Sequence, residues 1–130
     1  MPYMLMEHTI DPREKLLADL GDLTNIEIFN NKLLIAVYLR PEKTKSGFIM
    51  PGSNLNEDKY QSKVGLLVKM GNTAFKDESD VWFRGIKINY HDWLVSRPNN
   101  GWSMTVNGVL CRVIEDSLIE GRVQHPDEAW

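Results

Sequence analysis

The feature of the sequence that most constrains its fold is an Asn-Gly pair between two β-rich runs. Residues 102–106 and 109–114 carry aromatic and β-branched side chains, and Asn107 and Gly108 are the two residues between them. Asn-Gly is the preferred pair for a two-residue type I′ turn, because both turn positions need a positive φ angle. The sequence therefore predicts a tight antiparallel hairpin, with Cys111 as a buried structural thiol in its second strand.

Other runs of strand length accompany the hairpin. They lie at residues 33–39, 63–70, 92–97 and 121–123. Apolar and β-branched residues dominate the first two runs, and Pro, Gly or Asn residues lie just beyond several run ends. Strands at this spacing, with turn signals between them, favour a small barrel or sandwich. The predicted fold is therefore mainly β.

One helix is predicted ahead of the strands, at residues 11–20. Asp11 suits the N-cap, Pro12 suits the first helical position, and Glu14 completes a capping box. Three leucines between positions 16 and 20 share one face, and Gly21 is a fitting stop. Because a helix of about ten residues is marginal alone, it must pack on its own β domain or bind a partner.

Length and composition exclude several classes of function. The chain has 130 residues, enough for one domain, and its 15 basic and 18 acidic residues give a net charge of −3. Because no basic stripe is present, we expect no nucleic-acid partner and no membrane partner. A single cysteine allows no internal disulfide, and the N-terminus lacks a signal-peptide pattern, so we expect a cytoplasmic protein.

No residue pattern predicts catalysis, a cofactor or a metal site. His8, His91 and His125 are far apart in the sequence and lack the spacing of metal ligands. The acidic residues at positions 77, 78 and 80 lack the spacing and glycine of a calcium loop, which favours a solvated loop. The sequence has neither a Gly-rich phosphate loop nor a Gly-x-Ser-x-Gly elbow. We therefore expect a protein that is not an enzyme.

A long stretch without periodicity, residues 42–62, separates the first two predicted strands. Loops of this length inside a compact domain are uncommon, and they are usually functional or disordered. The one apolar cluster in the stretch is Phe48-Ile49-Met50, which lies amid polar residues. An exposed apolar triplet of this kind marks a partner-binding site. The alternative is a short buried strand under a loop.

Two parts of the sequence resemble the GroES (chaperonin-10) family of co-chaperonins. In the first, the 33–39 run precedes a basic and polar lead-in, a glycine, three apolar residues and a proline, which is similar to the family's mobile loop and lies at residues 43–51. In the second, residues 92–96 and 107–119 resemble the family's C-terminal strands in order and spacing. His91 replaces the family's usual glycine, and residues 73–84 do not resemble its roof hairpin. These differences from the family's pattern suggest a phage-encoded relative of a host co-chaperonin.

The resemblance implies a fold, an assembly and a set of contact residues. The implied fold is a GroES-like small β-barrel over residues 31–123, with a helix-bearing extension before it (1–30) and a C-terminal tail after it (124–130). The implied assembly is a homo-oligomeric ring, a heptamer in the family, which caps a GroEL-type chaperonin and assists ATP-dependent protein folding. The implied chaperonin contacts are Gly47, Phe48, Ile49, Met50 and Pro51, and the implied subunit-interface residues are Leu118, Ile119 and Val123.

The residues alone leave two other functions open. A phage structural or assembly protein could use the same small barrel as an interaction module, and its 42–62 segment would then be ordered and packed. An OB-like fold could bind single-stranded nucleic acid, with Trp82, Trp93 and Trp102 as stacking platforms. The absence of a basic groove favours core and interface packing for these tryptophans.

Overall fold

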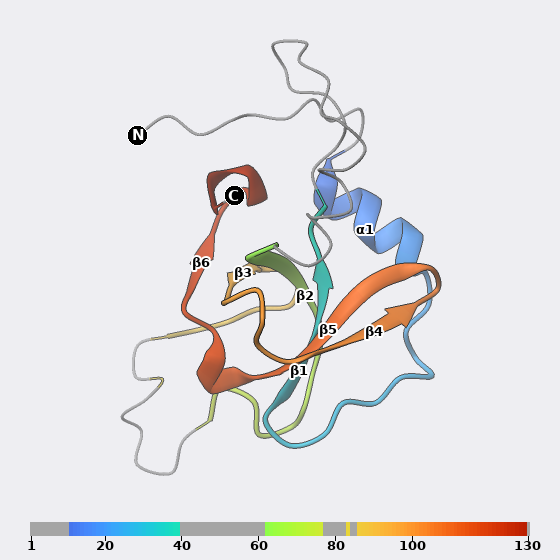
Figure 1. Cartoon of the computed structure of the whole chain (residues 1–130). Coiled ribbons are helices and arrows are strands. Elements are labelled where there is room, and N and C mark those ends of the chain that lie inside the picture. The colour runs from blue at the N-terminus through green and yellow to red at the C-terminus, as the bar shows by residue number, and fades with distance from the viewer. Residues whose placement is uncertain (1–10, 40–61, 77–82, 84–85, 130) are drawn as a thin grey trace.

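The computed structural model describes residues 11–39, 62–76, 83 and 86–129, and Figure 1 shows how they are arranged. The described residues form a mainly β structure with one α-helix, which confirms the prediction of a mainly β fold. In chain order the elements are α1 (Pro12–Leu20), β1 (Lys32–Val37), β2 (Val64–Met70), β3 (Trp93–Val95), β4 (Trp102–Val106), β5 (Val109–Glu115), the 3-10 helix η1 (Asp116–Leu118), β6 (Gly121–Val123) and the 3-10 helix η2 (Pro126–Ala129).

The six strands form one antiparallel sheet in the order β4-β5-β1-β2-β3-β6. Strand β1 is central, with β5 on one side and β2 on the other, and its pairing with β2 shifts register between Leu34 and Ile35. Strands β4 and β6 are the two edges, and they lie on opposite sides of the molecule in Figure 1. The hydrogen-bonded pairing of the described strands therefore gives an open sheet rather than a closed barrel.

The predicted Asn-Gly hairpin is confirmed. Strands β4 and β5 are joined by Asn107 and Gly108, whose φ angles of 49° and 81° are both positive. These values are those that a two-residue type I′ turn needs, because its twist matches the twist of the flanking strands. The Asn107 side chain also donates to the carbonyl of Leu20, so the turn is attached to the end of α1.

Apolar side chains cover both faces of the central strands. One face carries a larger cluster that includes Leu34, Leu66, Trp93 and Cys111. The other face carries a smaller cluster, made of Leu33, Ile35, Leu67, Ala74, Leu94 and Ile114. This two-sided burial explains why residues 33–38 read as a continuous apolar run instead of an alternating one: every one of them is buried. The sheet is therefore the middle layer of the core.

Helix α1 packs on its own domain, on the first of these faces. The Asp11 side chain accepts a hydrogen bond from the backbone N–H of Glu14 at 3.4 Å, as predicted for the N-cap. At the other end, Gly21 has a φ of 67° and donates to the carbonyl of Leu17 at 3.1 Å. Leu20 is fully buried in the core cluster. Of the two predicted roles for this helix, packing on its own β domain is the observed one.

The C-terminal segment packs against the sheet, with contacts to β2 and β6. Residues 126–129 form η2, in which Pro126 and Asp127 are almost wholly buried. The buried side chain of Asp127 accepts a hydrogen bond from the hydroxyl of Tyr38, the residue that directly follows β1. Among the described residues, no helix is long and apolar enough to cross a membrane.

Candidate functional site

The predicted chaperonin contacts, Gly47, Phe48, Ile49, Met50 and Pro51, lie outside the described residues. What the structure describes is the base from which residues 40–61 depart and to which they return. That base is formed by the end of β1 and the start of β2, which are direct neighbours in the sheet. Antiparallel neighbours need only a two-residue turn, so the long connection between them is not required by the topology.

Hydrogen bonds hold the two ends of this connection together. The backbone N–H of Tyr38 donates to the carbonyl of Val64 at 3.1 Å. The hydroxyl of Ser62, which is almost fully buried, lies 2.8 Å from the carbonyl of Tyr38 and 3.1 Å from that of Val64. Residues 40–61 therefore leave and re-enter the sheet at adjacent, closely bonded positions. We call Tyr38, Ser62 and Val64 the loop base.

The C-terminal 3-10 helix is attached to this loop base. The Tyr38 hydroxyl donates to the side chain of Asp127 in a short buried hydrogen bond, and the edge of the Tyr38 ring system meets Trp93 at a centroid distance of 5.7 Å. The backbone N–H of Asp127 donates to Nδ1 of His125 at 3.2 Å. Local sequence patterns could not indicate the contact between Tyr38 and Asp127, because these residues are 89 positions apart.

An apolar groove lies beside the loop base, between α1, the end of β1 and the β4–β5 turn. Its volume is about 320 Å³, and Pro12, Leu16, Val37, Leu39 and Val109 supply most of its apolar lining. Leu39 is 38% exposed, which is high for a large apolar side chain that directly follows a buried strand. The groove therefore lies beside Leu39, the last described residue before the 40–61 connection.

The residues predicted for the subunit interface lie at the other edge of the sheet. Leu118 and Ile119 are half-buried and pack against the smaller core cluster, while Val123 packs against the larger one. Their side chains are therefore partly used within the chain. Strand β6 itself pairs with β3 on one side and is an edge of the described sheet on the other. What β6 offers a neighbour is this backbone edge.

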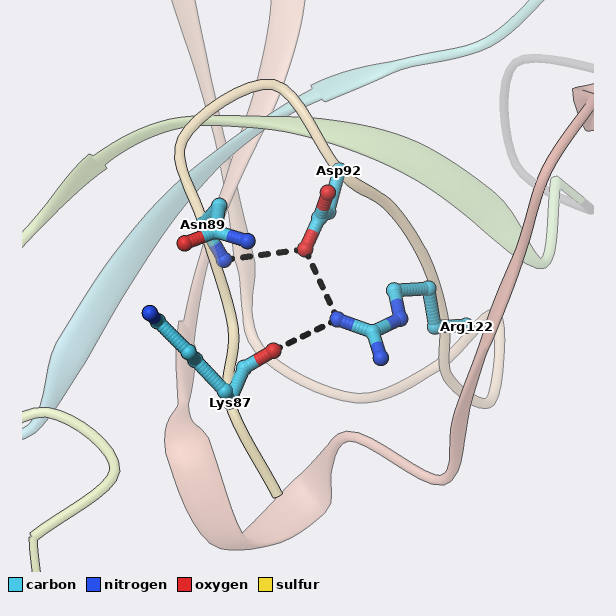
Figure 2. Close-up of polar contacts among 4 residues, drawn as sticks. All are labelled: Lys87, Asn89, Asp92 and Arg122. Carbon is cyan, nitrogen blue, oxygen red and sulfur yellow. Dashed lines mark hydrogen bonds and ion pairs between the residues drawn. The ribbon is translucent and has the colours of Figure 1, made fainter.

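A polar cluster fixes β6 to the turn that precedes β3 (Figure 2). Arg122 Nη1 donates to the carbonyl of Lys87 at 2.6 Å and lies 3.0 Å from an oxygen of Asp92. The same Asp92 oxygen accepts a hydrogen bond from the backbone N–H of Asn89 at 2.9 Å. We call Lys87, Asn89, Asp92 and Arg122 the β6 clip. Its geometry is that of a structural attachment.

Beside the clip is a second apolar cavity of about 340 Å³. It is lined by Phe75, Phe83, Ile86, Ile88 and Ile119, with Arg122 among the residues at its polar side. The rings of Phe75 and Phe83 meet edge to face with centroids 5.6 Å apart. Ile86 is 50% exposed, so the cavity opens beside a solvent-accessible apolar side chain. This cavity adjoins the edge strand on which the interface prediction falls.

The described residues contain no cluster of His, Cys, Asp and Glu that could hold a metal ion. His91 is exposed in a turn with a φ of 70°, and His125 belongs to the C-terminal attachment. Cys111 is fully buried, as predicted, and burial raises the pKa of its thiol to about 11. A thiol so far from its thiolate form is a poor nucleophile.

The tryptophans in the described part of the chain have different surroundings. Trp93 is buried in the core, as predicted, whereas Trp102 is 61% exposed on the edge strand β4. Trp82 lies outside the described residues.

A scan of the sequence against models of known protein families finds no match, and a search of curated proteins finds none either.

Proposed function

We propose that the protein is a co-chaperonin subunit of the GroES type, which caps a GroEL-type chaperonin and assists ATP-dependent protein folding. In this proposal the chain carries out no chemistry, since the nucleotide cycle belongs to the chaperonin. The finer fold is a GroES-like small β-barrel, built on the antiparallel sheet, and the assembly is a homo-oligomeric ring. The proposal keeps Gly47, Phe48, Ile49, Met50 and Pro51 as the chaperonin contact.

The observation that carries the proposal is the bonded loop base. Two neighbouring strands diverge at Tyr38 and meet again at Ser62 and Val64, where hydrogen bonds close the connection. Because the connection begins and ends at adjacent positions of the sheet, its length places no constraint on the rest of the fold. Because the apolar triplet Phe48-Ile49-Met50 lies in that segment, this arrangement supports a partner contact presented from a rigid base.

Energies explain why such a contact is reversible and needs a ring. Three large apolar side chains contribute roughly 5–9 kcal/mol gross when fully buried, at about 1.5–3 kcal/mol each. Ordering the segment opposes this at about 1–2 kcal/mol for each residue fixed. One loop therefore binds weakly, while several loops on one ring bind together through their high effective concentration. This is the behaviour that a lid requires, because it must close and then release.

The test is ATP-dependent co-elution with a bacterial chaperonin on a sizing column. We expect wild type to co-elute, and Ile49→Asp to lose co-elution while its oligomeric state stays unchanged, because a charge in an apolar groove is costly. Ile86→Asp is the matched control, since Ile86 is half-exposed and lies outside the 40–61 connection. We expect this control to co-elute like wild type.

Three outcomes would count against the proposal in different ways. If wild type fails to co-elute with several chaperonins, the phage assembly-module alternative replaces the lid. If Ile49→Asp binds as well as wild type, the contact is not Phe48-Ile49-Met50. If both isoleucine variants lose binding together, the effect is one of folding or assembly, which sedimentation velocity distinguishes.

A further inference from the structure

Arg112 is a buried cation in the middle of the sheet. It lies on β5 opposite Ile35 of β1, and its side chain is only 8% exposed. Its Nη1 donates to the carbonyl of Ser62 at 3.3 Å, at the loop base. Among the residues that the structure describes, this is the one hydrogen bond of the guanidinium, and it takes part in no ion pair.

This environment is unusual for an arginine. A guanidinium carries five N–H donors, and arginine is almost never fully buried without a partner. Burial lowers the pKa of Arg112 from its ordinary value, which is the direction for a desolvated cation. The described carboxylates near β5 are engaged elsewhere: Glu115 pairs with Lys32 at 2.6 Å, and Asp116 accepts from Asn31 and from the backbone of Phe75.

A small depression is lined in part by Arg112. Its polar lining comes from Arg112, Lys63 and Ser96, and no carboxylate is among its lining residues in the described chain. Its walls are apolar and come from Ile35, Val37, Val64, Gly65 and Ile114. The free volume of about 10 Å³ holds roughly one water-sized group. Of these lining residues, Lys63 is exposed, while Ser96 is 8% exposed.

We propose that Arg112, Lys63 and Ser96 form a binding site for a single carboxylate group. Two cationic residues and a serine line the depression, and their charged N–H and hydroxyl groups are donors of the kind that a carboxylate accepts. The depression has room for about one water-sized group, so one carboxylate oxygen enters it while the rest of the ligand stays outside. A bound carboxylate also neutralises a buried charge, which removes part of its desolvation cost.

The site is separate from the proposed chaperonin contact, but it adjoins the loop base. Arg112 reaches the carbonyl of Ser62, whose hydroxyl bonds the carbonyl of Tyr38. A carboxylate that binds Arg112 therefore lies next to the hydrogen bond from Arg112 to the Ser62 carbonyl, which is at the second end of the 40–61 connection. The carboxylate can come from a small free acid or from an acidic side chain of another protein, and the two sources need separate probes.

The experiment measures urea unfolding of the full chain at increasing sodium formate, with sodium chloride keeping the ionic strength constant. We expect the folding equilibrium constant to rise about tenfold at a formate concentration ten times the dissociation constant. Arg112→Met is expected to abolish this dependence. Arg97→Met is the matched control, because Arg97 loses the same charge from a side chain that is 73% exposed, and we expect it to respond like wild type.

A second variant and a second probe complete the test. Ser96→Ala keeps the buried cation and is expected to weaken formate binding several-fold, so the proposal stays testable if Arg112→Met does not fold. A blocked Gly-Asp-Gly peptide replaces formate to distinguish the sources: a response to the peptide indicates a side-chain carboxylate, and a response to formate alone indicates a free acid. The proposal is overturned if wild type responds to neither probe, or if Arg112→Met or Ser96→Ala responds as strongly as wild type.

Discussion

Two chain segments are attached to the sheet by polar contacts that differ mainly in burial. The C-terminal 3-10 helix is held by the contact between Tyr38 and Asp127, whose exposed fractions are 2% and 1%. The turn before β3 is held by the β6 clip of Figure 2, where the side chains of Arg122 and Asp92 are 46% and 22% exposed. Both attachments join segments that are distant in sequence, and both are satisfied.

The difference between the attachments lies in what replaces each contact when it breaks. Water reaches the β6 clip, so its donors and acceptors find new partners, and exposed ion pairs typically contribute only about 0–1 kcal/mol. Water does not reach Asp127 without opening the structure, so a hydrogen bond that is lost there is not replaced by one to water. Burial, more than the number of hydrogen bonds, therefore decides which attachment stabilises the fold, and three predictions test this.

The largest effect is expected for Asp127→Ala. This change removes an acceptor from the buried Tyr38 hydroxyl and leaves a space beside it, so the free energy of unfolding should fall by about 3 kcal/mol. Equilibrium unfolding in urea measures it, with an unchanged dependence on denaturant as the sign that both states remain comparable. A loss below about 0.5 kcal/mol would place the C-terminal segment outside the cooperative fold.

Asp127→Asn is the control for this substitution. Asparagine keeps an oxygen acceptor and nearly the same volume, so we expect it to lose only about 1 kcal/mol. If Asn and Ala lose the same amount, the charge of Asp127 matters more than its geometry. If Asn loses nothing, the negative charge of Asp127 contributes nothing, and the loss in the alanine variant comes from the missing acceptor and the missing volume.

Burial also predicts an alkaline effect at Cys111. The folded pKa of about 11 lies above the ordinary value of 9.0 because the buried thiolate is desolvated. A raised folded pKa means that the unfolded chain loses its proton first, so stability is full below pH 9 and falls as the pH rises toward 11. The loss at pH 11 should be about 2–3 kcal/mol, at about 1.4 kcal/mol for each unit of pKa.

The measurement for Cys111 is the difference between wild type and Cys111→Ala across pH 8–11. The alanine variant loses packing at every pH, but it lacks the thiol, so only wild type should show the additional alkaline loss. Every other ionisable group is common to the two proteins, so its effect cancels in the difference. Parallel curves would mean that Cys111 is accessible to water in the folded protein.

Local patterns predicted the elements of the fold, because each element satisfies rules that act over a few residues. The capping residues at Asp11 and Gly21 and the turn at Asn107 and Gly108 all appear where the sequence indicated them. Strand order was beyond such rules, since the paired residues of β3 and β6 are at least 26 positions apart. The open edges of the sheet are likewise a property of pairing, which side-chain patterns do not encode.

The candidate site was predictable only in part, for a related physical reason. An apolar triplet in a long polar stretch identified residues 47–51 without any structure, although these residues lie outside the described part of the chain. Local patterns could not predict the roles of Tyr38, Ser62 and Asp127, because the contacts between them join residues that are distant in the sequence. Arg112 did carry a signal, since a cation between the apolar neighbours Cys111 and Val113 of a predicted strand needs an explanation.

The smallest effect is expected at the β6 clip. Arg122→Ala should lower the free energy of unfolding by about 1 kcal/mol or less, because both its partners are accessible to water. Asp92→Ala should cost more than this, since Asp92 also accepts from the backbone of Asn89 and so shapes its turn.

A double-mutant cycle between Arg122→Ala and Asp92→Ala isolates the ion pair, with an expected coupling of about 0.5 kcal/mol that decreases as salt is added. A coupling as large as the loss in Asp127→Ala would contradict the argument from burial. It would show that the edge strand β6 is shielded from water in solution, and the obvious shield for the open edge of a sheet is another copy of the chain. The weakest contact described here therefore also reports on whether the β6 edge is covered in an assembly.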